Sequence, residues 1–412
     1  MTGSDDWQAL LAAAASDNVS GAHSVTADAA SVLVAYSEQA SPASRDELLA
    51  DLRRISCDLL SAQPAMASIA NLLNAAWWSV HDDSSLKTLP GAVESHTASA
   101  REAVIAVSRA ASALLAPEST VMTISASSTV AQALLLAHEE ALRPRVVCLE
   151  SRPMLEGQRF AAMLAENGLP VTLAVDAAAH DCVAQADLLF LGVDSLTPEG
   201  VLGKIGIAGL SLAARQAGLP VYALADRTKL WPVALGSPFI RQRPPEEVWP
   251  DPPGGVRVSN RYFDVADWAN VEGVVSEDGV LTAAEARKEG QAIPVHAELA
   301  ALYGEVAEEL SSAFPEPRDW YLYIISCSDN TLYTGITTDL ERRVAQHNAG
   351  KGAAYTASRR PVALQAAWLF PNRSAATRAE RAMKRRSRPG KLKAIERGDA
   401  FKGGPPAQIE PL

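Results

Sequence analysis

The C-terminal quarter of the chain carries a set of residue types that suits chemistry on a phosphodiester bond. The set comprises two tyrosines, Tyr323 and Tyr333, followed by Arg343, His347 and Glu380. Together they offer proton-transferring groups, a permanent positive charge and a carboxylate that needs a partner if it is buried. An excess of bases surrounds them. We therefore predict a phosphodiester-cleaving site in this segment.

Local patterns indicate which elements position these side chains. Residues 320–334 read as two strands around a turn, so a hairpin holds both tyrosines. Thr338 and Glu341 are spaced as a capping box that opens a helix, and Arg343 and His347 lie four residues apart on its inward face. A second helix, capped by Ser374, is expected to place on one face Ala376, Ala379, Glu380 and Met383.

The charge distribution separates this segment from the rest of the chain. The formal net charge of the 412 residues is -11, yet residues 318–412 hold 17 Lys and Arg against 8 Asp and Glu. The preceding 317 residues hold 20 against 40. Such asymmetry points to an anionic partner, with nucleic acid the first candidate. Phosphate contacts carry no sequence information, so we expect little base specificity from the residues of this basic face, Lys351, Arg359, Arg360, Lys384, Arg385, Arg386 and Arg388.

Two motifs in this segment identify a family resemblance. Tyr321-Leu322-Tyr323 and Tyr333-Thr334-Gly335, with Arg343, His347 and Glu380 at matching spacing, resemble the GIY-YIG nucleases, especially their small single-domain bacterial branch. The first motif has tyrosine where the family name has glycine, and the second has threonine where it has isoleucine. The resemblance implies a small α+β domain that acts as a DNA endonuclease, with a role in DNA repair or processing.

The resemblance also implies a role for each residue of the set. Glu380 would bind one divalent cation, Mg²⁺ or another such as Mn²⁺, and Arg343 would neutralise charge on the transferring phosphoryl group. Tyr323 would orient or deprotonate the attacking water, although the choice between Tyr323 and Tyr333 as the base stays open. Tyr333 would form a hydrogen bond within the site, and His347 would handle a proton or bind a phosphate.

The acidic N-terminal part predicts an α/β architecture. Residues 1–115 show helical apolar spacing and predict a helical layer, and from about residue 118 short β-branched runs alternate with helical stretches. This alternation is typical of a doubly wound parallel sheet, which binds ligands at the carboxyl ends of its strands. Hydroxyl and charged side chains at those ends predict a site for a phosphorylated small molecule, such as a sugar phosphate or nucleotide, formed by Ser125, Ser127, Arg152, Asp194 and Lys204.

These strand ends resemble the family that contains the alpha subunit of translation initiation factor 2B, ribose-1,5-bisphosphate isomerase and 5-methylthioribose-1-phosphate isomerase. The matching pieces include residues 124–130, 150–161, 192–196 and 203–206. The resemblance implies that Asp194 matches the isomerases' acid, and also a dimer through this domain. The departures are three, namely Ser125 in place of a cysteine, Ser20 in place of an arginine and Gly203 in place of an asparagine.

The departures favour a binding or regulatory domain over a working isomerase, because a hydroxyl is far less acidic than a thiol. The preferred hypothesis is thus a metal-dependent DNA endonuclease with a regulatory domain. A phosphorylated-pentose isomerase with a nucleic-acid-binding appendage and a non-enzymatic scaffold are the alternatives. Without an apolar run of membrane-spanning length or a signal peptide, we expect a cytoplasmic protein. The predicted domains are 1–115, 116–292, a helical linker 293–318, 319–397 and a flexible tail 398–412.

Overall fold

The computed structural model describes residues 6–17, 21–40, 42, 44–80, 87–252, 256, 258–313, 320–370 and 373–397. The chain forms two compact units, Met1–Phe314 and Pro315–Leu412. Across the described ranges, no helix has both the length and the apolar character needed to cross a membrane. The predicted tail 398–412 lies outside the described residues. The predicted α/β class, with a helical layer, a parallel sheet and a small C-terminal α+β domain, is confirmed.

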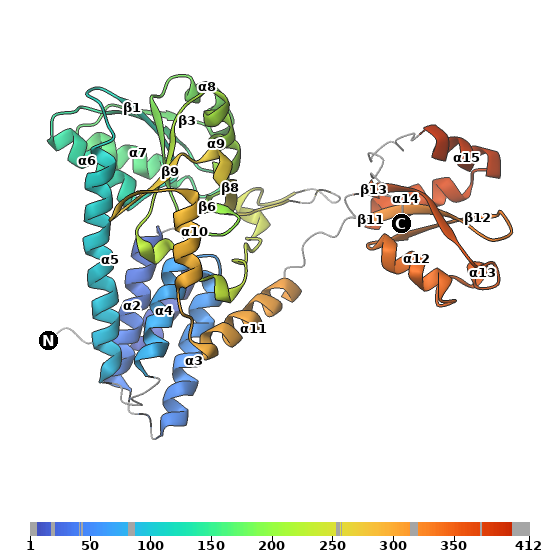
Figure 1. Cartoon of the computed structure of the whole chain (residues 1–412), viewed down its shortest axis with the longest axis horizontal. Helices are drawn as coiled ribbons and strands as arrows, with labels where there is room; N and C mark the ends of the chain where they lie inside the picture. Colours follow the sequence, from blue (N-terminus) through green and yellow to red (C-terminus); the bar gives the residue numbers. More distant parts are fainter. Residues whose placement is uncertain are drawn as a thin grey trace. The chain divides into compact units, whose positions relative to one another are not determined.

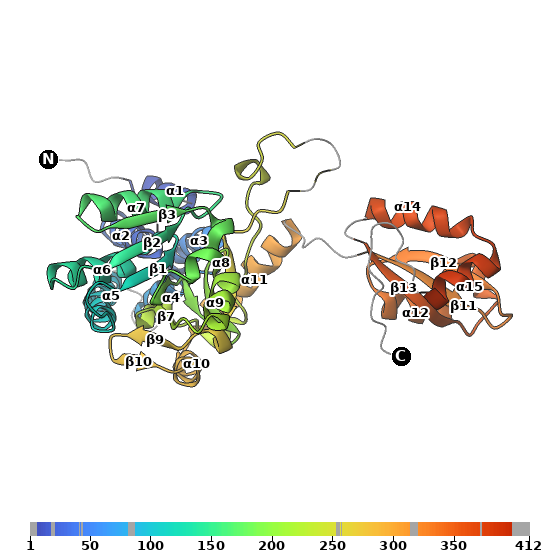
Figure 2. The ribbon, with the colours of Figure 1, turned by 90° about the horizontal axis from the view of Figure 1, so that it is seen from above.

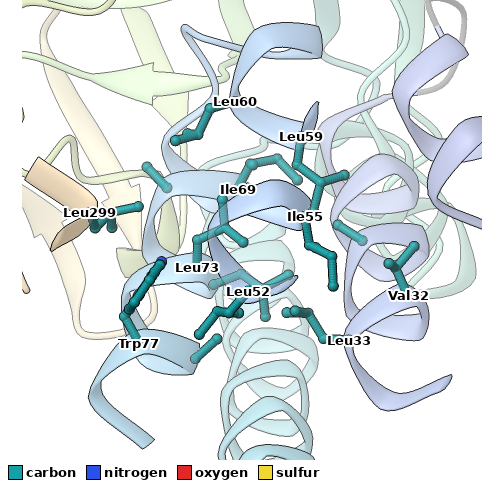
Figure 3. Close-up of a cluster of buried hydrophobic side chains, with 14 of the residues drawn as sticks. Val32, Leu33, Leu52, Ile55, Leu59, Leu60, Ile69, Leu73, Trp77 and Leu299 are labelled. Atoms are coloured by element: carbon teal, nitrogen blue, oxygen red, sulfur yellow. The ribbon is translucent and has the colours of Figure 1, made fainter. Parts of the chain in front are cut away.

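A layer of packed helices forms one part of the first unit (Figure 1). Its apolar core joins distant segments, since Leu52 and Trp77 are buried together with Leu299; Figure 3 shows these side chains converging. The helices are α1 (Trp7–Ser16), α2 (Ala22–Gln39), α3 (Arg45–Ala62), α4 (Ala67–Ser79), α5 (Thr88–Ser112) and α11 (Ala297–Ala313).

The segment predicted as a helical linker is corrected by this packing. Helix α11 buries Leu302, Tyr303 and Val306 in the core of the helical layer, so it belongs to the first unit and is not a spacer. Its apolar side chains repeat at helical spacing, and burial of that face against α3 stabilises it. Residues 314–318 of the predicted linker lie outside the described residues.

The second part of the first unit is a seven-stranded sheet with the order β10-β9-β7-β4-β1-β2-β3. All neighbouring pairs are parallel except β9 with β10. The order runs outward in opposite directions from β1 and β4, which makes this pair the switch point where ligands bind in such sheets. The strands are β1 (Thr120–Ile124), β2 (Arg145–Leu149), β3 (Val171–Ala174), β4 (Leu188–Gly192), β7 (Val221–Leu224), β9 (Gly273–Ser276) and β10 (Gly279–Leu281).

Helices and a small second sheet complete the first unit. The helices of the sheet domain are α6 (Ser128–Glu139), α7 (Glu156–Glu166), α8 (Ala179–Val183), α9 (Ile207–Gln216) and α10 (Ala283–Ala292). The antiparallel second sheet consists of β5 (Ser195–Leu196), β6 (Gly200–Lys204) and β8 (Phe263–Asp267). The 3₁₀ turns are η1 (Asp176–Ala178), η2 (Arg227–Lys229), η3 (Val233–Leu235), η4 (Pro245–Glu247) and η5 (Trp268–Asn270).

The C-terminal unit is a three-stranded antiparallel sheet with the order β12-β11-β13. The predicted hairpin is present as β11 (Trp320–Ser326) and β12 (Leu332–Thr337), and β13 (Ala363–Phe370) pairs with the other side of β11. Alternation along β11 sends Leu322 toward α14 (Arg373–Lys384) and Tyr323 toward α12 (Leu340–Asn348). The two helices therefore cover opposite faces of the sheet (Figure 2). The remaining helices are α13 (Ala354–Ala357) and α15 (Arg388–Arg397).

Candidate functional sites

The hydroxyl of Tyr323 is the centre of a polar cluster in the C-terminal unit. Tyr323 is 1% exposed, and its hydroxyl lies 2.9 Å from Nε2 of His347 and accepts from Nε of Arg343 at 3.3 Å. The residue opposite Tyr323 in β12 is Gly335, where a Cβ atom would lie 2.6 Å from the Tyr323 hydroxyl. The glycine of the second motif therefore makes room for the phenol of the first.

His347 is held from its other side as well. The ring is fully buried at the end of α12, and Nδ1 lies 2.6 Å from Oγ1 of Thr356 in α13. A Cβ atom on Gly352 would lie 2.3 Å from Nδ1, so only glycine leaves space for the ring there. Helix α12 begins at Leu340 and is capped by Asp339, which accepts from the Arg342 amide. The capping box predicted from Thr338 is thus wrong, because the carboxylate next to it takes the cap.

Burial and one cation set the electrostatics of this cluster. Burial, assisted by the nearby Arg343 guanidinium, lowers the pKa of His347 below its usual value. Burial raises the pKa of Tyr323, and the hydrogen bond and charge of Arg343 oppose that rise. Arg343 is itself fixed by a bond from Nη1 to Oε1 of Gln346 at 3.0 Å. At neutral pH the cluster therefore combines a neutral imidazole, a protonated phenol and a guanidinium.

The other two residues of the predicted set, Tyr333 and Glu380, differ in how they relate to this cluster. Tyr333 packs its ring 5.3 Å from the His347 ring and 6.4 Å from the Tyr323 ring, measured between centroids. Glu380 projects from α14, is mostly buried and accepts an ion pair from Nζ of Lys384 at 2.8 Å. Its charge acts on Tyr323, because it contributes to the raised pKa of that phenol. Four of the five predicted residues, Tyr323, Tyr333, Arg343 and His347, therefore form one cluster, whereas Glu380 lies on the helix that covers the other face of the sheet.

The residues of the predicted basic face are exposed except for the half-buried Arg359, and several are already held in place. Arg359 pairs with Asp329 at 2.9 Å, and its guanidinium lies 4.4 Å from the ring centre of Tyr355. Arg360 donates to the Ala357 carbonyl. The exposed positions of this face are Lys351, Arg360, Lys384, Arg385, Arg386 and Arg388.

A cavity of about 140 Å³ lies at the switch point of the N-terminal sheet. Ser125 and Ser127, which follow β1, line it together with Asp194, which follows β4, and Lys204 at the end of β6. Arg152 does not line it. The Arg152 side chain is exposed and donates to the Val248 carbonyl at 3.1 Å, because the turn after β2 directs it toward that loop. The structure thus brings together four of the five predicted ligand contacts.

The polar groups in the cavity largely pair with one another. Nζ of Lys204 lies 2.7 Å from Oε1 of Glu156, and the Ser125 hydroxyl donates to the same oxygen at 2.9 Å. The other carboxylate oxygen of Glu156 is buried without a hydrogen-bond partner. Burial raises the pKa of Asp194 above its usual value, against the opposing charges of Lys229 and Lys204. Ser20, a predicted departure from the isomerases, lies outside the described residues.

Sequence reasoning missed most of the cavity wall. Glu156 and the cations Lys229 and Arg243 are buried and line the cavity. Burial, together with Arg241, lowers the pKa of Arg243 to about 10. The helical layer supplies further polar residues from α2 and α5, namely His23, Thr26, His96, Thr97 and Arg101. Spacing on α5 was a usable signal, because Thr97 and Arg101 are four residues apart and fall on one helical face.

Comparison with known proteins assigns both units. The model of the initiation factor 2 subunit family matches residues 18–283, well over half of the chain. The chain belongs to the initiation factor 2 subunit family. The ribose 1,5-bisphosphate isomerase of Archaeoglobus fulgidus is 30% identical to this family member over 275 residues, which are 64% of this chain and 85% of that protein. The solved structure of Pyrococcus horikoshii OT3 translation initiation factor eIF-2B shares the fold, with 24% identity, a TM-score of 0.61 and coverage of 68% and 97%.

The C-terminal unit of this family member matches a second family. A GIY-YIG catalytic domain model matches residues 319–393. A UPF0213 protein of Staphylococcus haemolyticus is 55% identical over 76 residues, which are 18% of this chain and 93% of that protein. The chain is therefore a fusion of an initiation-factor-2B-like unit with a GIY-YIG domain of nuclease type, and both predicted resemblances are confirmed.

Proposed function

We propose that the C-terminal domain is a metal-dependent endonuclease that hydrolyses phosphodiester bonds in DNA. The observation that carries the proposal is the Tyr323 hydroxyl, which is shared between a neutral imidazole of His347 and the guanidinium of Arg343. A phenol near its reference pKa of about 10 is a poor base at pH 7, but one whose proton can pass to an imidazole is a useful one. The match to the GIY-YIG catalytic domain supports this function.

The mechanism moves one proton along this chain of groups. The attacking water gives its proton to the Tyr323 oxygen while the Tyr323 proton passes to Nε2 of His347. The water oxygen bonds to phosphorus, the bond from phosphorus to the leaving oxygen breaks, and the leaving oxygen takes a proton from solvent. Arg343 stabilises negative charge beside the phenol oxygen. Tyr333 walls the site and holds the His347 ring in place.

The residues present fit a divalent cation at Glu380. No group of three or more His, Cys, Asp or Glu side chains that could hold a metal occurs in the described part of the chain. Mg²⁺ is often bound by one or two carboxylates and completes its shell with water and substrate phosphate. Glu380 already holds a cationic group, the Lys384 ammonium, at 2.8 Å. When bound, Mg²⁺ or Mn²⁺ polarises the phosphate and stabilises the leaving oxygen.

The basic face supports binding to the DNA backbone in preference to reading of bases. Its exposed lysines and arginines suit phosphate contacts, which fix position without sequence information. We therefore propose that the enzyme selects DNA by structure, as a repair or processing nuclease would.

For the N-terminal unit we propose binding of a sugar phosphate or nucleotide that regulates the fused domain. The buried cations Lys204, Lys229 and Arg243 favour an anionic ligand, and the unpartnered oxygen of Glu156 favours a ligand with hydroxyl groups. Isomerase activity is the alternative, supported by the raised pKa of Asp194, which suits proton transfer. Replacing Asp194 with Asn would abolish isomerase turnover. The family resemblance also leads us to propose a homodimer, which light scattering would measure.

Cleavage of duplex, nicked, flapped and branched DNA by the full chain with Mg²⁺ tests the nuclease. Glu380→Ala and a chelator should each abolish cleavage, and Glu341→Ala, which removes an exposed carboxylate of α12, should leave it unchanged. Cleavage that survives Glu380→Ala, or no cleavage of any substrate, would contradict the proposal.

A further inference from the structure

The hydrogen bonds around His347 have one consistent set of directions. The Thr356 hydroxyl donates its single proton to the Ala353 carbonyl at 2.9 Å. Thr356 must therefore accept from Nδ1 of His347, which lies 2.6 Å away. A neutral imidazole has one N–H, so Nε2 is an acceptor and takes the proton of the Tyr323 hydroxyl at 2.9 Å. The Tyr323 oxygen in turn accepts from Arg343.

The opposite tautomer leaves groups without partners. If Nε2 of His347 carried the proton, it would donate to the Tyr323 oxygen, and the Tyr323 proton would lose the acceptor it has here. Thr356 would have to turn its proton to Nδ1, and the Ala353 carbonyl would lose that donor. Leaving a buried donor unpaired is unfavourable, because it loses its bond to water and gains none in the protein. The site therefore selects the tautomer protonated at Nδ1.

We infer that Thr356 is a positioning residue of the nuclease site, whose hydroxyl holds His347 in the tautomer that accepts the proton of Tyr323. The inference rests on the proposed nuclease function, but the hydrogen bonds that carry it are properties of the fold alone. Thr356 acts through His347, as a group on the far ring nitrogen does in other imidazole bases. The Thr356 hydroxyl thus sets the direction of proton transfer from Tyr323 to His347. We call these hydrogen-bonded groups, Tyr323, His347 and Thr356, the relay.

The surroundings of His347 leave the ring no other arrangement. Both Thr356 and His347 have no exposed surface, and Gly352 closes around Nδ1. The titratable and charged groups that face the ring are Tyr323 from β11, Tyr333 from β12 and Arg343 from α12 itself. Among these, only the Tyr323 hydroxyl has a hydrogen bond to the ring in the described structure.

Thr356→Val removes the hydroxyl and keeps the shape of the side chain. We expect the cleavage rate constant at saturating DNA to fall at least about tenfold, since correct general acid–base catalysis contributes about 10²–10⁴-fold. KM should stay unchanged, because Thr356 touches no substrate. Thr356→Ser restores the hydroxyl and should recover most of the rate. The matched control is Thr334→Val, because Thr334 is also buried in this domain and its hydroxyl has no partner.

The pH profile separates positioning from support of the fold. Losing the Thr356 acceptor disfavours the imidazolium, which needs an acceptor for each of its two N–H groups, so the acid limb of the rate profile should move to lower pH in Thr356→Val. A purely structural role would lower the whole profile without moving the limb. A limb that stays in place while the rate falls would therefore overturn the inference.

The tautomer is measured directly by ¹⁵N NMR of the full chain labelled at histidine. Wild type should show His347 protonated at Nδ1, and Thr356→Val should shift population toward Nε2. Wild type protonated at Nε2 would overturn the inference even if Thr356→Val does not fold. If wild type cleaves and Thr356→Val cleaves equally well with the same tautomer, the inference fails and the nuclease stands. If wild type cleaves nothing, the nuclease fails and the NMR result still decides the role of Thr356.

Discussion

The N-terminal cavity and the C-terminal polar cluster both bury polar side chains, but they satisfy them differently. In the cavity, charge is compensated by charge: Lys204 pairs with Glu156, and the charges of Lys229 and Lys204 act on Asp194. In the C-terminal cluster, the buried groups Tyr323 and His347 are neutral and form a directed chain of hydrogen bonds. The cavity still has an orphan carboxylate oxygen, whereas every polar atom of the relay has a partner.

This difference suits the two sites to different tasks. A cavity with compensated charge and an unpaired acceptor is organised to hold a polar ligand, which adds the missing partner. A chain of neutral groups with one direction is organised to pass a proton from one group to the next. The supporting folds differ as well. The cavity lies between a helical layer and a seven-stranded sheet, whereas the relay is built on a three-stranded sheet.

The strongest test of the relay is Tyr323→Phe. It removes the hydroxyl shared by His347 and Arg343, so we expect DNA cleavage to fall about 10²–10⁴-fold, the usual worth of proton transfer. Single-turnover cleavage assays measure this. Tyr321→Phe is the matched control from the same strand. An equal loss of cleavage in Tyr321→Phe would contradict the assignment of proton transfer to Tyr323.

The charge pairing of the cavity is tested by Lys204→Met. Removing one partner of a buried pair leaves Glu156 uncompensated, which costs about 3–5 kcal/mol of unfolding free energy. Denaturant unfolding followed by circular dichroism measures it, and Lys204→Met with Glu156→Gln should recover much of the loss. Arg145→Met, which breaks an exposed pair with Glu118, should cost under about 1 kcal/mol. Equal losses of unfolding free energy from Lys204→Met and Arg145→Met would contradict the expected difference between a buried and an exposed ion pair.

The rate of DNA cleavage should also depend on pH, because the relay contains the titratable side chain of His347. Protonated His347 cannot accept the Tyr323 proton, and its folded pKa lies below the usual 6.5, so cleavage should fall about tenfold per pH unit below that lowered pKa and be flat above it. Because the unfolded chain binds the proton more readily, acidification below 6.5 also destabilises the fold. A cleavage limb above pH 6.5 would exclude neutral His347 as the acceptor.

The smallest effect is expected from single residues of the basic face. Arg385→Ala should weaken DNA binding a few-fold and reduce the slope of log affinity against log salt by about 0.9, the value of one phosphate contact. Fluorescence anisotropy over a salt series measures both. Arg145→Ala, an exposed arginine of the N-terminal unit, serves as control, and a slope that changes equally there would place DNA on the first unit too.

The sequence determined the features that depend on local pattern and spacing. Alternation in residues 320–334 predicted the hairpin, and motif spacing brought Tyr323, Arg343 and His347 to one neighbourhood. The strand-to-helix alternation predicted the parallel sheet, and the rule for strand ends placed Ser125 and Asp194 in the cavity. Periodicity and turn chemistry act over a few residues, so the sequence expresses them directly.

Tertiary structure alone decided which distant groups meet. Arg152 follows the right strand, but its turn sends it to the Val248 loop, whereas Lys229 and Arg243 enter the cavity from segments that no pattern singled out. Helix α11 reads as a spacer until its apolar face packs on α3. Thr356 lies in a four-residue helix, and nothing local marks it as the partner of His347. Such contacts depend on loop paths and long-range packing, which local propensity does not determine.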